Sequence, residues 1–240
     1  MDFKEFIIND RERRNKEKFE GSFLEYLDIV KENPDVAKLA HKRMNDIITS
    51  QGYEVLKPEE NPRIDKVLMK LMNYLNSASM KGEEARQVLY LVGPVGAGKS
   101  SLVESLKKAL ESADRIYTIK GCPMHEEPLH LIPKHLRKEF EEKLGVQIEG
   151  DLCPICKYRL MHEYDGKYEE MPVTTSSFSI RSRKGVGVVP PVDPNNQDTS
   201  ILTGSVDISK MDLYAEDDPR IFSLNGAFNV GNRGIVEFIE

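Results

Sequence analysis

The spacing of apolar residues divides the chain into a helical first part and a mixed second part. Before residue 87, apolar side chains recur every three or four positions, which is the period of an amphipathic helix. Residues with low helix preference, Asn33-Pro34-Asp35, Gly52 and Asn61-Pro62-Arg63, interrupt this pattern. The sequence therefore predicts an amino-terminal helical region over residues 1–86, with helices near residues 23–30, 36–48 and 64–75.

After residue 86 the pattern predicts strands that alternate with helices. Residues 88–92 (Val-Leu-Tyr-Leu-Val) are an unbroken apolar run, typical of a strand buried on both faces. Residues 115–120 and 234–240 predict a second and a third strand, and residues 101–110 and 133–144 predict helices. Strands joined through helices favour a parallel sheet with right-handed crossovers. The predicted fold class is therefore α/β, with helices flanking a parallel sheet.

A phosphate-binding pattern directly follows the first predicted strand. Its residues are Gly93, Pro94, Val95, Gly96, Ala97, Gly98, Lys99 and Ser100, which satisfy G-x-x-x-x-G-K-[ST], and Ser101 comes next. Glycines allow a tight bend whose N–H groups converge on phosphate oxygens, and the following helix directs its positive end at them. Lys99 can reach the β- and γ-phosphates, and the Ser100 hydroxyl can bind Mg²⁺. We predict that residues 93–101 bind ATP with Mg²⁺, and that Lys99 is catalytic.

Composition and charge restrict the class of protein. The chain carries 40 acidic and 34 basic residues, a net charge of −6, which argues against a broad nucleic-acid surface. The basic runs at 11–14 and 181–184 are expected to be solvated faces or contacts between subunits. No apolar run approaches the roughly 20 residues of a membrane span, and residues 1–5 lack a signal-peptide pattern. With only three cysteines, a cytoplasmic protein without a disulfide framework or membrane partner is expected.

The cysteines form two short groups that predict a metal site. Cys122 and His125 flank Pro-Met, and Cys153 and Cys156 flank Pro-Ile. Together they make Cys₃His, the ligand set of a closed, structural Zn²⁺ site, and His130 is a rival fourth ligand. Two alternatives stay open: a redox couple of Cys153 and Cys156, or cysteines without any ligand.

The third predicted strand ends on a possible catalytic acid. ATPases of this type use an Asp that holds Mg²⁺ through water, followed by a Glu that polarises the attacking water. Glu240 stands in the Glu position, but Ile239 stands where the Asp is expected. Either Glu240 serves both purposes or another acid, such as Asp207, supports the metal; alternatively, Glu240 is only a surface acid.

Several of these segments resemble the PrkA family. The resemblance rests on residues 93–100, on Lys120-Gly121-Cys122-Pro123-Met124-His125-Glu126-Glu127-Pro128-Leu129 and on Gly150-Asp151-Leu152-Cys153-Pro154-Ile155-Cys156. PrkA proteins are known as serine protein kinases with an amino-terminal AAA+ module. The resemblance implies that residues 87–240 are a truncated AAA+ nucleotide-binding core, with a zinc insertion at 121–171.

A wider resemblance concerns the insert-bearing AAA+ ATPases, such as magnesium chelatase subunits and enhancer-binding activators. It rests on Leu202–Asp207, Gly226 and Asn232–Val236. It implies a β-hairpin insertion over residues 172–206, with Arg181 and Arg183 facing a partner. It also implies assembly into a homo-oligomeric ring, usually a hexamer.

The leading functional hypothesis is therefore an ATP-binding AAA+ module that couples ATP turnover to phosphorylation or remodelling of a protein substrate. A P-loop small-molecule kinase and a non-hydrolysing ATP-dependent scaffold are the alternatives. Whether the fragment by itself is an enzyme is left open, because a sensor Asn, an arginine finger and a lid are not recognisable.

Overall fold

The chain folds into two compact units, each assembled from several stretches of sequence. The computed structural model describes residues 18–50, 62–80, 82–191, 198–215 and 217–239, together with positions 3 and 8. Unit 1 comprises Met1–Ala37, Arg115–Ser177 and Val206–Ser223, and unit 2 comprises Lys38–Asp114, Phe178–Ser205 and Leu224–Glu240. This grouping differs from the expected division between residues 86 and 87, because residues on both sides of that point belong to unit 2.

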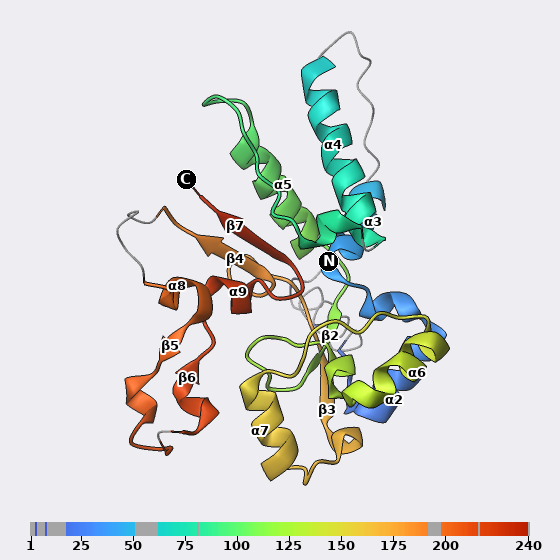
Figure 1. Cartoon of the computed structure of the whole chain (residues 1–240), viewed down its shortest axis with the longest axis vertical. Coiled ribbons are helices and arrows are strands. Elements are labelled where there is room, and N and C mark those ends of the chain that lie inside the picture. The colour runs from blue at the N-terminus through green and yellow to red at the C-terminus, as the bar shows by residue number, and fades with distance from the viewer. Residues whose placement is uncertain are drawn as a thin grey trace. The chain divides into compact units, whose positions relative to one another are not determined.

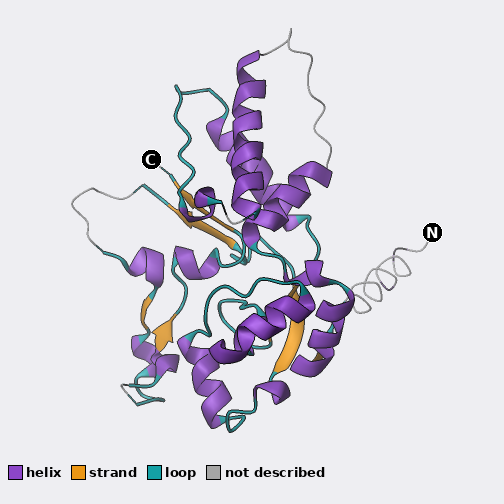
Figure 2. Cartoon of the chain, turned by 45° about the vertical axis from the view of Figure 1, so that its right-hand side comes forward, coloured by secondary structure: helices purple, strands orange, loops and turns teal. Residues whose placement is uncertain are grey.

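Helices and connecting loops account for most of the described chain, and the strands are short (Figure 2). The helices are α2 (Phe23–Glu32), α3 (Ala40–Ser50), α4 (Pro62–Ser79), α5 (Lys99–Glu111), α6 (Lys134–Leu144), α7 (Pro154–His162), α8 (Ser200–Thr203) and α9 (Ala227–Val230) (Figure 1). The strands are β1 (Glu20–Ser22), β2 (Ile116–Ile119), β3 (Pro172–Ser176), β4 (Val186–Val189), β5 (Ser205–Val206), β6 (Phe222–Ser223) and β7 (Ile235–Phe238). The helices expected from periodicity are thus confirmed within the described residues.

Unit 1 is built on a small antiparallel sheet. Its strand order is β1-β3-β2. The predicted strand at 115–120 is confirmed as β2, but it pairs antiparallel with β3, so that Ile116 faces Ser176 and Ile119 faces Val173. The expectation that this strand joins a parallel sheet with residues 88–92 is therefore wrong. Sequence periodicity identifies a strand but not its neighbour, which depends on residues distant in the chain.

Helix α2 supplies the aromatic core of unit 1. It begins with a capping box in which the Glu25 N–H donates to Ser22 Oγ at 3.3 Å and the Ser22 N–H donates to the Glu25 carboxylate at 2.6 Å. One face of the helix buries Phe23, Tyr26 and Val30 completely. The Tyr26 ring lies 5.2 Å from the ring of Tyr117 on β2, so the helix packs directly on the sheet.

Unit 2 contains the parallel strand pair β4–β7. Val186 faces Ile235 and Val189 faces Phe238. Helix α9 packs on β4 at Gly187, where a Cβ would lie only 2.2 Å from the Ala227 carbonyl oxygen. Helices α3 and α4 lie side by side, and α3 also contacts α5 (Figure 1). This unit holds the small parallel sheet that an α/β fold requires.

The apolar run at 88–92 is not a buried strand here. It belongs to none of the sheets that the described residues form. Val88, Tyr90 and Val92 are 85%, 67% and 81% exposed. The predicted strand is therefore wrong for this structure, because an apolar run becomes a central strand only when neighbouring strands pair with it. The third predicted strand is confirmed as β7, although Phe238 is 53% exposed rather than buried.

The expected hairpin insertion at 172–206 is also absent from the described residues of that range, which are 172–191 and 198–206. Strand β3 pairs within unit 1, whereas β4 pairs with β7. Between them, only the bridge from Ser179 to Lys184 closes a tight turn. The glycines and prolines after residue 184 indicate chain reversals but do not specify which strands pair.

None of the described helices combines the length and the apolar character needed to cross a membrane.

Candidate functional site

The glycine-rich segment, residues 93–98, leads directly into helix α5. Gly96 and Gly98 both adopt φ of +82°, a conformation that side chains other than glycine rarely take. Gly98 is the residue that precedes the helix, and its carbonyl accepts the Leu102 N–H at 2.9 Å. Because the first-turn N–H groups of a helix have no partner within it, they face the segment and can bind an anion.

Lys99 folds back onto this segment. Its Nζ donates to the carbonyl oxygens of Gly93 at 2.6 Å and Pro94 at 2.9 Å. Ser100 is exposed and stands one position further along the first turn of α5. The structure therefore places an ammonium group, a hydroxyl and helix N–H groups around one short loop. This combination can bind phosphate oxygens and a phosphate-bound Mg²⁺.

Strand β7 is attached to α5 by a charged contact. Lys107 is 3% exposed and donates to the Glu237 carboxylate at 2.8 Å, and it also pairs with Glu104. Burial alone would lower the pKa of Lys107, but the two carboxylates outweigh it and raise that pKa. The side chain is therefore held charged, and it fixes the strand beside the helix that begins at the glycine-rich segment.

The acids expected near Mg²⁺ are not assembled by the described residues. Glu240 lies outside them. Asp207 lies in unit 1, where its carboxylate accepts from Ser209 Oγ at 2.6 Å and pairs with Lys210 at 3.3 Å. Arg183 donates to the Asn225 carbonyl at 3.2 Å, and Arg181 is exposed. The roles assigned to Lys99, Ser100 and Glu240 stay predictions.

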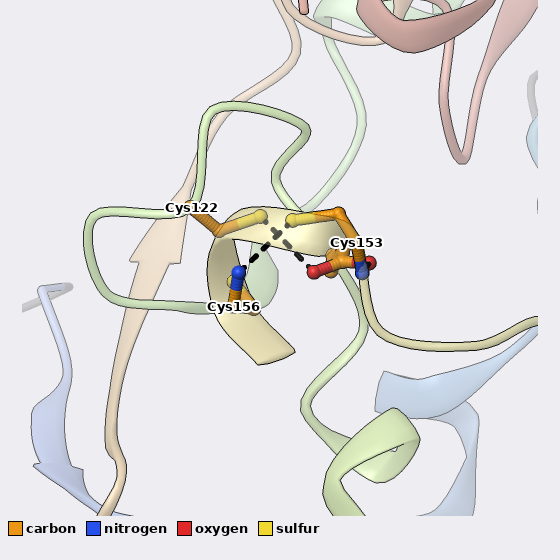
Figure 3. A group of neighbouring side chains, drawn as sticks. Cys122, Cys153 and Cys156 are labelled. Atoms are coloured by element: carbon orange, nitrogen blue, oxygen red, sulfur yellow. Dashed lines mark hydrogen bonds between the residues drawn. The ribbon is translucent and has the colours of Figure 1, made fainter. Parts of the chain in front are cut away.

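The three cysteines come together in unit 1, as their spacing predicts. The side chains of Cys122, Cys153 and Cys156 lie next to one another (Figure 3). Their sulfur atoms and a carboxylate oxygen of Glu126 all lie within 4.8 Å of one another. We call these four residues the cysteine cluster. All of them are buried, with exposures between 0% and 4%. Such a set of donors could hold a metal ion.

The fourth member of the cysteine cluster is Glu126, where the sequence favoured His125. The Cys122 thiol donates to Glu126 Oε2 at 3.3 Å, and the other carboxylate oxygen accepts the Cys153 N–H. His125 adopts φ of +49° in the turn that follows Cys122 and is not part of the cluster. The Cys-x-x-His spacing therefore located the turn that carries Cys122, whereas the assignment of His125 as a zinc ligand stays a prediction. His130, the rival ligand, bonds through Nε2 to the Glu149 carbonyl at 2.6 Å.

Burial and mutual repulsion perturb the acidic groups of the cysteine cluster. Burial, followed by the negative charge of Cys153, raises the pKa of Glu126 to about 8. Hydrogen bonds from Cys122 and Cys156 lower the pKa of the Cys153 thiol. The pKa values of Cys122 and Cys156 are both raised, chiefly by hydrogen bonding within the trio. Four acidic groups in one enclosed space cannot all ionise unless a cation neutralises them.

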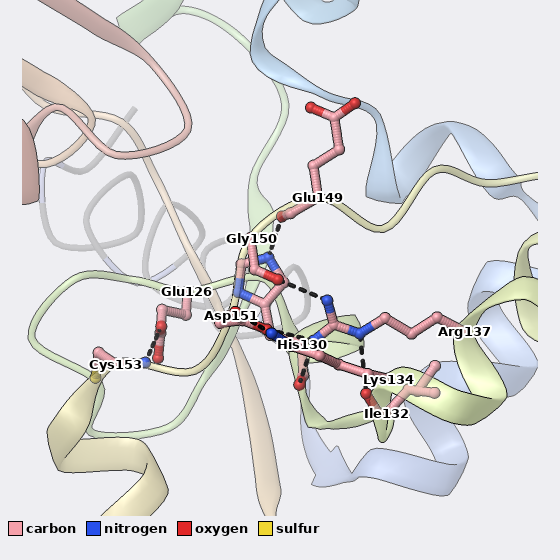
Figure 4. Close-up of polar contacts among 9 residues, drawn as sticks. All are labelled: Glu126, His130, Ile132, Lys134, Arg137, Glu149, Gly150, Asp151 and Cys153. Carbon is pink, nitrogen blue, oxygen red and sulfur yellow. Dashed lines mark hydrogen bonds and ion pairs between the residues drawn. The ribbon is translucent and has the colours of Figure 1, made fainter.

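A network around Arg137 shapes the loop that leads into Cys153 (Figure 4). The guanidinium of Arg137, on α6, donates to the carbonyl oxygens of Ile132 at 3.1 Å and Gly150 at 2.6 Å. Asp151 pairs with Lys134 at 2.8 Å, and this contact, reinforced by Arg137, lowers the pKa of its carboxyl. Gly150 has φ of +99°, and a Cβ there would approach the His130 ring to 3.0 Å. The loop is thus fixed by α6 before the chain enters α7.

Comparison with known proteins identifies the family of this chain. The family model of the PrkA AAA domain matches residues 21–69 and 64–240. The chain belongs to the PrkA AAA-domain family. This membership confirms the expected resemblance and indicates that an AAA-type domain is present.

Two curated relatives align over most of the chain. The "ATP-dependent protease PrkA" of Bacillus subtilis is 41% identical over 255 aligned residues, which cover 100% of this chain and 40% of the relative. The "Serine/threonine kinase YeaG" of Escherichia coli K12 is 33% identical over 189 residues, which cover 76% of this chain and 29% of that relative. No solved structure matches. The chain therefore spans less than half the length of these relatives.

Glu126 and Glu127 are the residues that sequence reasoning missed. Both are buried, at 2% and 9% exposure, and Pro128 and Leu129 follow them directly in the sequence. Acidic residues are rarely buried unless they are paired or bind a metal. Their position next to a Cys-x-x-His pattern was the available signal, but spacing rules for zinc favour histidine over carboxylate.

Proposed function

We propose that this chain is the nucleotide-binding module of a PrkA-type protein, which binds MgATP at residues 93–101 and couples its turnover to action on a protein substrate. The observation that carries the proposal is the glycine-rich segment with its two left-handed glycines, placed at the start of α5 with Lys99 folded onto it. Membership of an AAA family supports the use of ATP. ATP and Mg²⁺ are the proposed cofactors of this site.

In the proposed complex, Lys99 exchanges the carbonyls of Gly93 and Pro94 for the β- and γ-phosphates. The N–H groups at the start of α5 donate to the same phosphates, and the Ser100 hydroxyl binds Mg²⁺. Glu240 orients the attacking water when ATP is hydrolysed. In a kinase reaction, a serine hydroxyl of the protein substrate takes the place of that water.

The reaction on the protein substrate is proposed only in general terms, as phosphorylation or remodelling. One relative is named an ATP-dependent protease and the other a serine/threonine kinase. The two names therefore differ on the reaction that the protein substrate undergoes. We propose that the complete protein works as a homo-oligomeric ring, as AAA+ modules usually do. The chain covers 40% of the Bacillus relative, so the activity named for that relative is not assigned to this chain alone.

Calorimetry with MgATP and MgADP tests the nucleotide site. The wild-type chain is expected to bind both, and Lys99→Ala is expected to weaken MgATP binding about 10- to 100-fold, because a charge-assisted bond to phosphate contributes about 1.5–3 kcal/mol. Lys108→Ala is the matched control, since Lys108 is an exposed lysine on the same helix. Binding by Lys99→Ala equal to that of wild type, or no binding by folded wild-type protein, would contradict the proposal.

A non-hydrolysing ATP-dependent scaffold is the second candidate function. It is favoured by Ile239, which stands where an Asp that supports Mg²⁺ is expected. The rate of phosphate release from ATP, measured for wild type and for Glu240→Gln, distinguishes a hydrolysing module from a non-hydrolysing scaffold. A catalytic Glu240 predicts measurable turnover that falls at least tenfold in the variant, with MgATP affinity preserved. Equal rates near the background in both proteins, with MgATP still bound, would support the scaffold.

A further inference from the structure

The cysteine cluster is the strongest grouping of metal-ligating side chains among the described residues. It combines three thiols and one carboxyl from two segments that are distant in sequence, and all four side chains are buried. Buried ionisable groups are unfavourable unless they are paired or bind an ion. The cluster lies wholly in unit 1, whereas residues 93–101 lie in unit 2.

Backbone hydrogen bonds shape the first segment of the cluster, which carries Cys122 and Glu126. Gly121, at φ of +77°, is the third residue of a turn in which the Cys122 N–H donates to the Ile119 carbonyl at 3.0 Å. The Ile119 N–H in turn donates to the Glu126 carbonyl at 3.2 Å, which closes the loop at the end of β2. Cys122 and Glu126 therefore stand on a tight loop whose shape is set by backbone hydrogen bonds.

The second segment of the cluster, which carries Cys153 and Cys156, lies at the start of helix α7. Cys153 is the residue that precedes α7, and its Sγ accepts the Cys156 N–H at 3.3 Å (Figure 3). Both sulfur atoms thus lie at the amino-terminal end of α7, where the helix dipole favours thiolates. The loop before Cys153 is held by Arg137, so the position of this end is fixed independently.

We propose that Cys122, Glu126, Cys153 and Cys156 bind one Zn²⁺ ion in a closed structural site. Zinc prefers thiolate, imidazole and carboxylate ligands in a tetrahedron, with bonds of about 2.3 Å to sulfur and about 2.0–2.2 Å to oxygen. Such bonds place the ligand atoms roughly 3.3–3.8 Å apart. The atoms here lie within 4.8 Å of one another, so a small contraction completes the tetrahedron.

Glu126 is the fourth ligand in this proposal because both of its oxygens already point into the cluster. One accepts from the Cys122 thiol, and the other from the Cys153 N–H. On metal binding, those of the four groups that are still protonated release their protons to solvent, and Glu126 exchanges its contact with the Cys122 thiol for the ion. The Cys153 N–H then serves to orient the carboxylate, as second-shell donors do in metal sites.

The bound ion would join the end of β2 to the start of α7. It replaces the hydrogen bond between the Cys122 thiol and the Glu126 carboxylate with four metal bonds, so we expect it to stabilise unit 1. With four protein ligands, no position is left for water, and the site is structural rather than catalytic. This inference does not depend on the proposed nucleotide site, since zinc content is measured without ATP.

Metal analysis of the intact chain tests the proposal. Protein purified under reducing conditions, or reconstituted with ZnCl₂ and desalted, is expected to contain one zinc per chain by elemental mass spectrometry. Titration of the wild-type thiols with a mercurial, monitored by a chromogenic zinc chelator, should release that ion in step with thiol modification. This second measurement needs no variant and therefore does not depend on the folding of one.

Paired variants test the ligand set. Glu126→Gln is expected to weaken Zn²⁺ affinity at least tenfold, Cys156→Ser is expected to abolish stoichiometric binding, and His125→Asn is expected to retain one zinc per chain. Circular dichroism checks that each variant is folded. Zinc-free folded wild type after reconstitution would overturn the proposal, as would loss of zinc in His125→Asn with retention in Glu126→Gln. A Cys153–Cys156 disulfide in zinc-free protein would instead support a redox couple.

Discussion

Tyr26 connects the aromatic core of unit 1 to the segment that carries the cysteine cluster. The side chain is completely buried, and its hydroxyl donates a hydrogen bond to Glu127 Oε1. Glu127 directly follows Glu126. A hydrogen bond to a buried carboxyl group contributes more than an exposed one, because water cannot replace it. Tyr26 therefore helps to set the position of the loop at residues 122–127.

The substitution Tyr26→Phe tests this connection. It removes only the hydroxyl and is expected to lower the free energy of unfolding by about 1–2 kcal/mol. Urea denaturation followed by circular dichroism measures the change. Tyr168→Phe is the matched control: its ring also packs on Phe23, at 6.1 Å, but no hydrogen bond of its hydroxyl is found among the described residues. An equal loss in both variants would show that the bond to Glu127 contributes nothing specific.

Individual residues were predicted well where a short pattern carries the chemistry. The Cys-x-x-Cys pattern located the turn of Cys153 and Cys156, because such turns bring residues three apart to the same side. The Cys-x-x-His pattern located the turn of Cys122, although His125 is not part of the cluster. The presence of Glu126 in the cysteine cluster, in place of the expected His125, could not be derived from the spacing of the residues. Which of two adjacent side chains enters the cluster depends on the backbone of the turn, where His125 adopts a φ of +49°, and spacing alone does not specify that conformation.

At the scale of elements, helices were predictable and strand partners were not. Helix α6 ends at Leu144, followed by Gly145 at φ of +67°, as the periodicity and the glycine indicate. Helix signals are local, so a window of a few turns suffices. Strands β2 and β7 were also located, but β2 pairs with β3 and the run at 88–92 pairs with no described strand. Pairing is a property of distant segments and leaves little trace in either one.

Gly185 illustrates how one residue fixes the entry to strand β4. Its φ is +69°, and a Cβ there would lie 2.2 Å from Phe178 Cδ1, a buried ring. Gly145 has nearly the same φ, +67°, but a Cβ there would meet nothing within 4 Å. The two glycines therefore differ in packing while they share the same backbone requirement.

Substituting alanine at Gly145 and at Gly185 distinguishes the cost of backbone strain from the cost of steric overlap with Phe178. Gly145→Ala is expected to cost about 1–2 kcal/mol, the usual penalty of a left-handed conformation with a Cβ. Gly185→Ala should cost about 1–3 kcal/mol more, because the ring of Phe178 has to move within the core. Chemical denaturation of both variants gives the difference. Equal destabilisation would mean that the ring shifts without penalty.

At the scale of the whole molecule, the two proposed sites are built from different parts of the chain. The cysteine cluster belongs to unit 1, and the glycine-rich segment with α5 belongs to unit 2. The sequence order does not reveal this, since the chain leaves unit 1 after residue 37, returns at residue 115 and leaves again after residue 177. The expected linear division, helices first and core second, could not anticipate such interleaving.

Hydrogen exchange measured by mass spectrometry tests whether the cysteine cluster and the glycine-rich segment respond independently to their ligands. Saturating MgATP is expected to slow exchange of peptides covering residues 96–104, because their N–H groups become bonded to phosphate. Removal of zinc by a chelator is expected to speed exchange at 119–127 and 152–160. Each treatment should leave the peptides of the other site unchanged. Protection of the cysteine-cluster peptides by MgATP would show that the two sites are coupled.

The resting position of Lys99 has one further consequence. Its ammonium group already occupies the bend, held by the carbonyl oxygens of Gly93 and Pro94. If the proposed MgATP site is correct, binding of a triphosphate exchanges these two carbonyl partners for phosphate oxygens. A lysine whose position is already restricted loses little conformational entropy in that exchange.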